Sequence, residues 1–218
     1  MAQSVRTIAS NCLGKSGTLS VKEDLLGVYA NDNPQNRSLK QRLDLIENNP
    51  FVSIALVTIQ GASPQLQRDL DNTNTVLQGE CGAWLYPVDS ITVKRPNLQV
   101  LNQNTCPLGV QADPTDEEDE LFDLGRGFGT DLVGYYIQSG PGAGCSAYPA
   151  GRRGFWVDDG GSPWTFCHEL VHVVGLNAHV TNSDNLMSTP TASITNPPPD
   201  MTNGQCFRFI SDPTVESC

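Results

Sequence analysis

The chain has 218 residues, a length that fits one domain or one domain with an extension. Its formal net charge of −11 argues against nucleic acid or an anionic membrane surface as a partner. The longest apolar run, Phe51 to Ile59, is too short to cross a bilayer, so we expect no membrane span.

Seven cysteines in a chain of this length indicate a disulfide framework. The first residues, from Met1, lack the apolar core of a secretory signal. Both observations fit a secreted protein whose signal peptide has been removed, and we expect an extracellular location. The odd count means that at least one cysteine is free or pairs between molecules.

Residues 1–49 carry few residues typical of a functional site, and we interpret them as an N-terminal extension or a pro-region-like segment. The domain proper then spans 50–218. Residues 51–59 are apolar on both faces, as a buried strand should be. Further strands are predicted over 84–93, as one or two strands broken near Pro87, and over 132–138 and 153–158.

Helix start and stop signals divide the rest of the domain. Ser63 as cap, with Pro64 in the first turn, predicts a helix that Gly79 closes. Ser162-Pro163 predicts the start of a second helix, which carries histidines. A final helix is capped by Thr202 and carries Cys206, Phe209 and Ile210.

Acidic residues gather between positions 113 and 123. Such a run could bind calcium or steer basic substrates. However, Thr115 and Glu118 have the spacing of a capping box, and acids are favoured at a helix N-terminus. We therefore predict a helix over 115–124 with Leu121 and Phe122 inward, and calcium stays an unsupported alternative.

All the histidines lie in one short stretch: His168, His172 and His179. His168 and His172 are four residues apart, so on a helix they share a face and can bind one ion. Glu169 stands beside that ion, which suits the general base that activates the attacking water at a zinc site. Gly175 can end the helix and turn the chain, so that His179 approaches the same ion.

The stretch 168–187 resembles the zinc-binding region of the metzincin peptidases: His-Glu-x-x-His, a glycine three residues on, a later histidine and then Asn-Leu-Met. In that clan the third ligand is normally three residues after the glycine, a place that Ala178 occupies here. His179 is one residue late, yet Met187 follows it by the matrixin-like spacing to the methionine of the Met-turn. One extra residue in the turn after Gly175 explains both.

The resemblance implies an α+β, metzincin-like zincin fold: a twisted, mostly parallel sheet above an active-site helix, and a C-terminal subdomain with the Met-turn and the final helix. It implies that 153–158 is an edge strand that pairs with an extended substrate, and that residues 188–199 shape the pocket for the side chain after the scissile bond. It covers 50–218 as an order of elements and is specific only over 168–187.

The implied activity is that of a zinc endopeptidase acting on a protein or peptide. His168, His172 and His179 hold one zinc ion, Glu169 serves as general base and then general acid, and Met187 forms an apolar floor under the metal. In matrixin-like zymogens a pro-segment cysteine occupies the fourth zinc position. Cys12 is a candidate for that role, but its flanking residues do not reproduce the motif and an ordinary disulfide is favoured.

Two alternatives remain open. One is a zinc hydrolase outside the metzincins, with Asp184 or another acid as third ligand. The other is a secreted, non-catalytic module that keeps zinc for structure, although intact Glu169 and the lack of an obvious fourth ligand argue against it. Cys167 shares a helix stripe with Val171 and Val174, away from the histidines, so we expect it to be packed or disulfide-bonded.

Overall fold

The structure, a computed structural model, describes residues 49–102, 106, 115–128, 130 and 132–216. The predicted N-terminal segment, including Cys12, lies outside the described residues except for Asn49. The predicted boundary at residue 50 stays a prediction.

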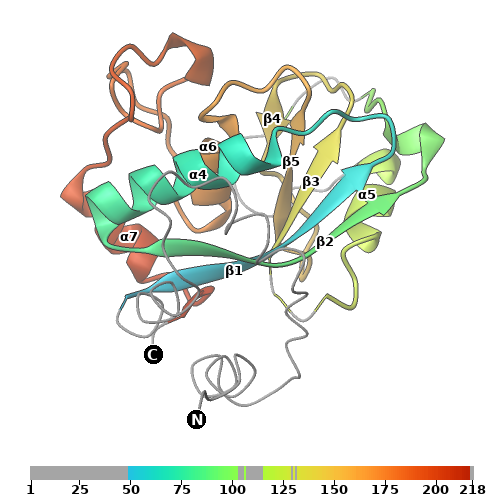
Figure 1. The fold of residues 1–218 in the computed structure, drawn as a ribbon, viewed down its shortest axis with the longest axis horizontal. Helices are drawn as coiled ribbons and strands as arrows, with labels where there is room; N and C mark the ends of the chain where they lie inside the picture. Colours follow the sequence, from blue (N-terminus) through green and yellow to red (C-terminus); the bar gives the residue numbers. More distant parts are fainter. Residues whose placement is uncertain (1–48, 103–105, 107–114, 129, 131, 217–218) are drawn as a thin grey trace.

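The described part is a mixed α/β fold around a mostly parallel sheet (Figure 1). The strands follow the order β2-β1-β3-β5-β4, and β6 pairs with β1. Pairing is parallel from β2 through β1 and β3 to β5, whereas β4 and β6 are antiparallel to their neighbours. The strands are β1 (Phe51–Ile59), β2 (Trp84–Val93), β3 (Val133–Ile137), β4 (Gly144–Cys145), β5 (Gly154–Asp158) and β6 (Val215–Glu216).

The predicted edge strand is wrong. Residues 153–158 correspond to β5, which lies between β3 and β4 rather than at the margin of the sheet. The edge is formed by β4, whose Gly144 and Cys145 pair with Val157 and Trp156. A strand of two residues is too short to show an alternating pattern, so the sequence did not reveal it.

The second strand is continuous, with an irregularity next to its proline. Ile54 of β1 pairs with Pro87 and Ala55 pairs with Asp89, so Val88 is an extra residue at a shift in register. Proline has no N–H for the ladder, and a bulge accommodates it. Of the two predicted forms of 84–93, the structure has the single strand.

Helices cover both faces of the sheet. On one face Tyr136 and Phe155 contact Phe166 of α6 (Thr165–Val173), with ring centroids 5.8 and 4.8 Å apart. On the other face Tyr135 contacts Phe122 of α5 (Asp116–Asp123), with centroids 5.0 Å apart. Because successive strand residues point to opposite faces, neighbouring tyrosines serve different helices. The helix α4 (Leu66–Val76) lies alongside α6 (Figure 1).

Two helices start two residues later than predicted. α4 begins at Leu66, and the backbone N–H of Ser63 instead donates to Asp159 Oδ1 at 2.7 Å. α6 begins at Thr165, while the Ser162 hydroxyl donates to Thr191 Oγ1 at 2.8 Å. The N-cap residue of α4 is Gln65, which has no side-chain cap. Ser162 Oγ still accepts from the Trp164 N–H at 3.3 Å, just before the first residue of α6.

The end of the first helix also differs from the prediction. α4 continues into a π-helical turn, η1 (Leu77–Cys81), and the left-handed residue that closes it is Gly82, with φ of 62°. The predicted terminator, Gly79, lies inside that turn. Left-handed conformation is what makes glycine the usual terminator, and Gly79 does not adopt it.

The other two helices are capped as predicted. Thr115 and Glu118 form a capping box at α5, and Leu121 and Phe122 are buried. Thr202 forms a second box with Gln205 at α7 (Asn203–Ile210). Within α7, Cys206 and Phe209 are buried while Ile210 is 38% exposed and points outward. Short 3-10 turns lie at η2 (Pro96–Leu98) and η3 (Thr191–Ser193).

The described cysteines form two disulfides. Cys81–Cys206 joins η1 to α7, and Cys106–Cys145 attaches the edge strand to the segment before α5. Cys167 is free and buried. Cys167 agrees with the expectation of at least one unpaired cysteine, while Cys12 and Cys218 lie outside the described residues.

Within the parts of the chain that the structure describes, we find no helix of the length and apolarity needed to cross a membrane.

Candidate metal centre

The helix α6 and the turn after it bring the three histidines together. His168 and His172 share one face of α6, and both are buried. Gly175 follows the helix with φ of 96°, a left-handed conformation that glycine adopts without strain. Its N–H donates to the His172 carbonyl at 3.2 Å, and the chain then returns with His179. The predicted role of Gly175 in the turn is confirmed.

The three imidazoles converge through the same ring atom. His168 Nε2 lies 3.0 Å from His172 Nε2 and 3.2 Å from His179 Nε2, and the third separation is 3.0 Å. A tetrahedral ion with bonds of about 2.0–2.1 Å separates its ligand atoms by about 3.3 Å. The spacing of this histidine cluster (His168, His172 and His179) therefore fits one small cation.

Backbone carbonyls determine which nitrogens carry the protons. His168 Nδ1 lies 2.8 Å from the Leu186 carbonyl, and His172 Nδ1 lies 2.5 Å from the Leu176 carbonyl. A carbonyl only accepts, so in both neutral rings Nδ1 holds the hydrogen and Nε2 has the lone pair. Two facing lone pairs cannot hydrogen-bond to each other. The arrangement calls for a cation between them.

Burial keeps these imidazoles neutral. It lowers the pKa of His168 to about 4 and the pKa of His172 to about 3, and it also lowers the pKa of His179. Near pH 7 the rings thus present lone pairs rather than protons. Neutral imidazole is the form that binds a metal, so protons compete only in acid.

Glu169 lies on α6 between the two helical histidines and is 8% exposed. Burial raises the pKa of this carboxyl group to about 8, and a hydrogen bond with Ser146 acts in the opposite direction. A cation held by the adjacent histidines would stabilise the ionised form. Without one, the buried carboxyl group favours its proton.

The segment that supplies the Leu186 carbonyl is attached to the final helix. The Asn185 and Gln205 side-chain amides pair through two hydrogen bonds of 2.9 and 3.0 Å. Asn185 Oδ1 also accepts from the Met187 N–H at 2.9 Å, and both Leu186 and Met187 are fully buried. The capping box of α7 therefore helps to orient His168, at a distance along the chain that sequence patterns do not report.

The other candidate ligands lie elsewhere. Asp184 is outside the histidine cluster, and its Oδ1 accepts from Thr195 Oγ1 at 2.6 Å. Burial raises the pKa of Cys167 to about 12, so its thiol is not disposed to bind metal. Across the described residues, the histidine cluster is the one group of three or more such side chains close enough to hold an ion. The acidic run, which includes the undescribed Asp113, gains no support as a calcium site.

Four residues around Glu169 and the start of α6 were not predicted from the sequence. Thr165 and Thr191 join Ser162 in a set of mutually bonded hydroxyls, which fixes η3 to the start of α6. Gly144 and Ser146 belong to or follow the edge strand and approach Glu169 directly. No spacing rule marks Gly144, Ser146 or Thr191, because strand pairing and hydroxyl contacts between distant residues bring them to α6.

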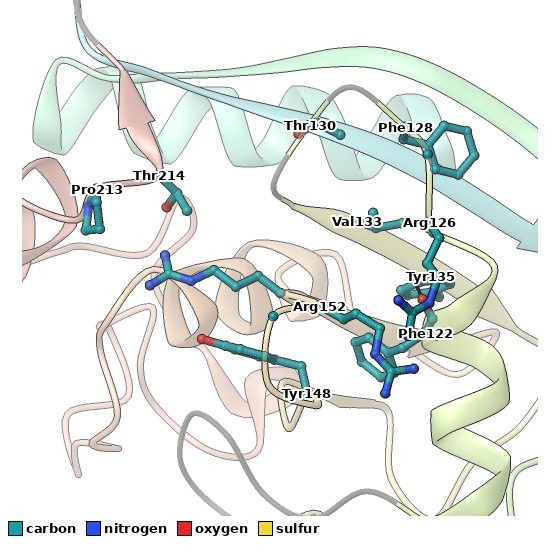
Figure 2. A pocket seen from close by; sticks show the side chains of 14 residues that line it. Phe122, Arg126, Phe128, Thr130, Val133, Tyr135, Tyr148, Arg152, Pro213 and Thr214 are labelled. Carbon is teal, nitrogen blue, oxygen red and sulfur yellow. Dashed lines mark hydrogen bonds between the residues drawn. The ribbon is translucent and has the colours of Figure 1, made fainter. Parts of the chain in front are cut away.

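A cavity of about 540 Å³ lies on the α5 side of the sheet, between Phe122 of α5 and Tyr135 of β3 on one side and Thr214 on the other (Figure 2). Figure 2 shows side chains of α5, the following loop and β3 around it. Its arginines are paired with acids of the chain: Arg152 with Asp119 and Asp123, and Arg153 with Asp212. We call it the arginine-lined cavity; its lining includes Phe122, Arg126, Tyr135, Tyr148, Arg152, Arg153 and Thr214.

Comparison with known proteins gives a likeness of fold. The sequence matches no protein-family profile, and no curated protein matches it. Metalloproteinase-II from Bacteroides fragilis is similar in structure, with a TM-score of 0.52 and 13% identity, over 75% of this chain and 53% of that one. The chain thus spans about half the length of that protein. An archaemetzincin from Methanopyrus kandleri gives a TM-score of 0.45 and 19% identity, over 74% of this chain and 95% of that one, which is too weak to establish a shared fold.

Proposed function

We propose that the domain over 50–218 is a zinc-dependent endopeptidase of the metzincin type. The observation that carries the proposal is the convergence of three Nε2 atoms, two of which have lone pairs directed by backbone hydrogen bonds. The fold likeness to a metalloproteinase supports it. The N-terminal segment 1–49 is then an extension or a pro-region-like segment.

His168, His172 and His179 are the proposed zinc ligands, and their chemistry fits this ion. Zinc prefers nitrogen donors in tetrahedral sites, and a catalytic site uses three protein ligands and leaves one position open. When bound, zinc supplies a Lewis acid that makes water a stronger acid and polarises the scissile carbonyl. The Leu186 and Leu176 carbonyls hold the imidazoles in the ligating tautomer.

Glu169 is the proposed general base and general acid. It is one residue from His168 and three from His172, so its carboxylate reaches the space next to the ion without being a ligand. It takes a proton from the attacking water and returns that proton to the leaving amine. Its burial excludes bulk water from the transfer.

The edge strand β4 is the proposed binding place for an extended substrate. β4 pairs with β5 on one side, and among the described strands none occupies its other side. Free backbone groups at a sheet edge can hydrogen-bond a peptide as an added strand. Gly144 of this strand lies next to Glu169, so a peptide added there passes the proposed base.

Met187 is the proposed methionine of a Met-turn, and His179 the third ligand after a turn one residue longer than usual. Met187 is fully buried, and its carbonyl accepts from the Val180 N–H at 3.0 Å, which connects the turn to the residue after His179. The two disulfides are compatible with the proposed secreted location.

Proteolysis of casein and of unstructured peptides tests the function. We expect the purified protein to cleave both, a chelator to abolish cleavage, and stoichiometric zinc to restore it. Glu169→Ala should keep zinc, because Glu169 is not a ligand, and lose about a hundred- to ten-thousand-fold in rate, the usual contribution of general-base catalysis. Cleavage by Glu169→Ala at the wild-type rate would show that the proposed mechanism is wrong.

A further inference from the structure

The close approach of Gly144 to Glu169 suggests a reason for glycine at that position. A Cβ atom on Gly144 would lie 2.8 Å from Glu169 Cγ, 3.1 Å from Glu169 Oε1 and 2.9 Å from Thr165 Cγ2. Carbon atoms in contact prefer about 3.5–4.0 Å, so two of these separations are severe overlaps. The backbone of Gly144 does not have positive φ. Space, rather than backbone conformation, is therefore what excludes a side chain.

The edge strand cannot easily move away to make room. Gly144 pairs with Val157, and Cys145 pairs with Trp156. The disulfide with Cys106 holds the same strand from its other end. A side chain at position 144 therefore has to be accommodated by α6, not by β4.

On α6 one of the two contacted side chains is fixed and the other can rotate. The Thr165 hydroxyl lies 3.1 Å from the Ser162 hydroxyl and 2.9 Å from the Thr191 hydroxyl, which holds its rotamer. Glu169 Cγ can move by rotation about its first side-chain bond. That rotation would break the hydrogen bond between the Glu169 carboxyl group and Ser146 and move the carboxyl group from its present position.

We propose that Gly144 is a positioning residue for Glu169: the absence of a side chain on the edge strand sets where the carboxylate lies. The inference rests on the proposed function for its catalytic consequence, but the contact itself does not depend on activity. A substrate paired along β4 is then held at a distance from the base that the size of residue 144 determines.

Gly144→Ala tests the catalytic consequence, with Gly142→Ala as the matched control in the same segment. A Cβ on Gly142 would meet only Gly144 O at 3.8 Å, an ordinary contact. We expect Gly144→Ala to lower kcat on the order of a hundredfold, as misplacement of a catalytic group by about 1 Å can do. KM should stay within about threefold, because alanine offers the substrate the same backbone groups. Zinc affinity should also be unchanged, since no ligand moves. A kcat equal to that of Gly142→Ala would overturn the proposal.

Thermal unfolding tests the contact separately. Gly144→Ala should lower Tm by several degrees, since overpacking destabilises. The loss of Tm should be smaller when Gly144→Ala is combined with Glu169→Ala, and the part that remains is attributed to the contact with Thr165. An equal loss in both backgrounds would overturn the proposal. If Gly144→Ala does not fold, recovery of folding in the double variant supports it and failure of both overturns it. A wild-type protein without peptidase activity would contradict the proposed function, while this unfolding cycle would still decide the contact.

Discussion

The histidine cluster and the arginine-lined cavity are both rich in ionisable groups, yet they satisfy them differently. In the cavity Arg152 and Arg153 meet acids of the same chain, so positive charge is neutralised internally. In the histidine cluster, the Nε2 lone pairs of His168 and His172 face each other, because both Nδ1 atoms donate to backbone carbonyls. Charged groups that are neutralised by other groups of the same chain need no ligand and can be assigned a structural role. A group that lacks a partner indicates a ligand from outside.

The two regions also shift the pKa values of their carboxyl groups in opposite directions. Burial raises the pKa of Glu169 to about 8. Burial also acts to raise the pKa of Asp212, but hydrogen bonds from Thr214 and Arg153 and the Arg153 charge outweigh it, and the pKa lies below its ordinary value. The native fold thus favours a protonated Glu169 and an ionised Asp212.

The largest expected effect concerns metal affinity. His179→Ala should weaken zinc binding more than about a hundredfold, because even a residue that only orients a ligand contributes about 10- to 100-fold. Asp184→Ala is the matched control: its carboxylate bonds Thr195, outside the histidine cluster. Competition with a chromophoric chelator measures both affinities. The reverse ranking would mean that His179 is a bystander and Asp184 a ligand.

The second effect is a pH dependence of the metal-free protein. Because the folded pKa of Glu169 is raised from 4.5 to about 8, its ionisation destabilises the fold progressively as pH rises through that interval. Glu169→Gln removes this titration. The metal-free variant should therefore be more stable than the wild type at pH 8, by on the order of a few kcal/mol in the free energy of unfolding. Denaturant unfolding at pH 4 and pH 8 measures the difference. A constant difference would show that Glu169 is not desolvated.

Asp212 should contribute a pH dependence of stability that is opposite in sign to that of Glu169 and smaller. Its folded pKa lies below the unfolded value of 3.8, so the stability it contributes is present above pH 3.8 and is lost as pH falls through the folded pKa. Asp212→Asn should cost roughly 1–2 kcal/mol at pH 7, as expected for hydrogen bonds to a charged group. The cost should vanish in strong acid. Persistence of the full cost there would contradict the assigned cause.

The smallest expected effect is a change in stability at the arginine-lined cavity that leaves the histidine cluster unaffected. Arg152→Met should lower stability by about 1 kcal/mol, and less in high salt, because Asp119 and Asp123 are half exposed and salt screens exposed charges. Its kcat and zinc affinity should equal those of wild type. A changed zinc affinity would show that the arginine-lined cavity and the histidine cluster are coupled across the sheet.

Prediction from the sequence succeeded for elements whose signal is local. Residues 51–59 are long and continuously apolar, and the capping boxes of α5 and α7 involve residues three apart. It failed where another part of the chain decides. The helix α4 is capped at Gln65 and not at Ser63, whose N–H donates to Asp159 on a distant loop. The strand β4 has two residues, too few for an alternating pattern, so no stretch of the sequence indicated that it forms the edge of the sheet.

The candidate site divides in the same way. The pairing of His168 and His172 on one helix face follows from helix geometry, and Gly175 marks the turn. His179 was expected from a family resemblance, and the structure brings it to the other two. The carbonyls that orient the rings and the edge-strand glycine above Glu169 depend on tertiary folding, so no spacing in the sequence predicts them.

The disulfide Cys81–Cys206 encloses most of the domain, with a sequence separation of 125. A single backbone cut anywhere between these cysteines leaves two fragments that each retain one end of the bond. The exposed stretch around η3 lies inside this loop, as do the edge strand and all three histidines. A molecule cut there by a peptidase stays in one covalent piece until it is reduced, so such a cut is invisible on a non-reducing gel and appears only when the bond is opened.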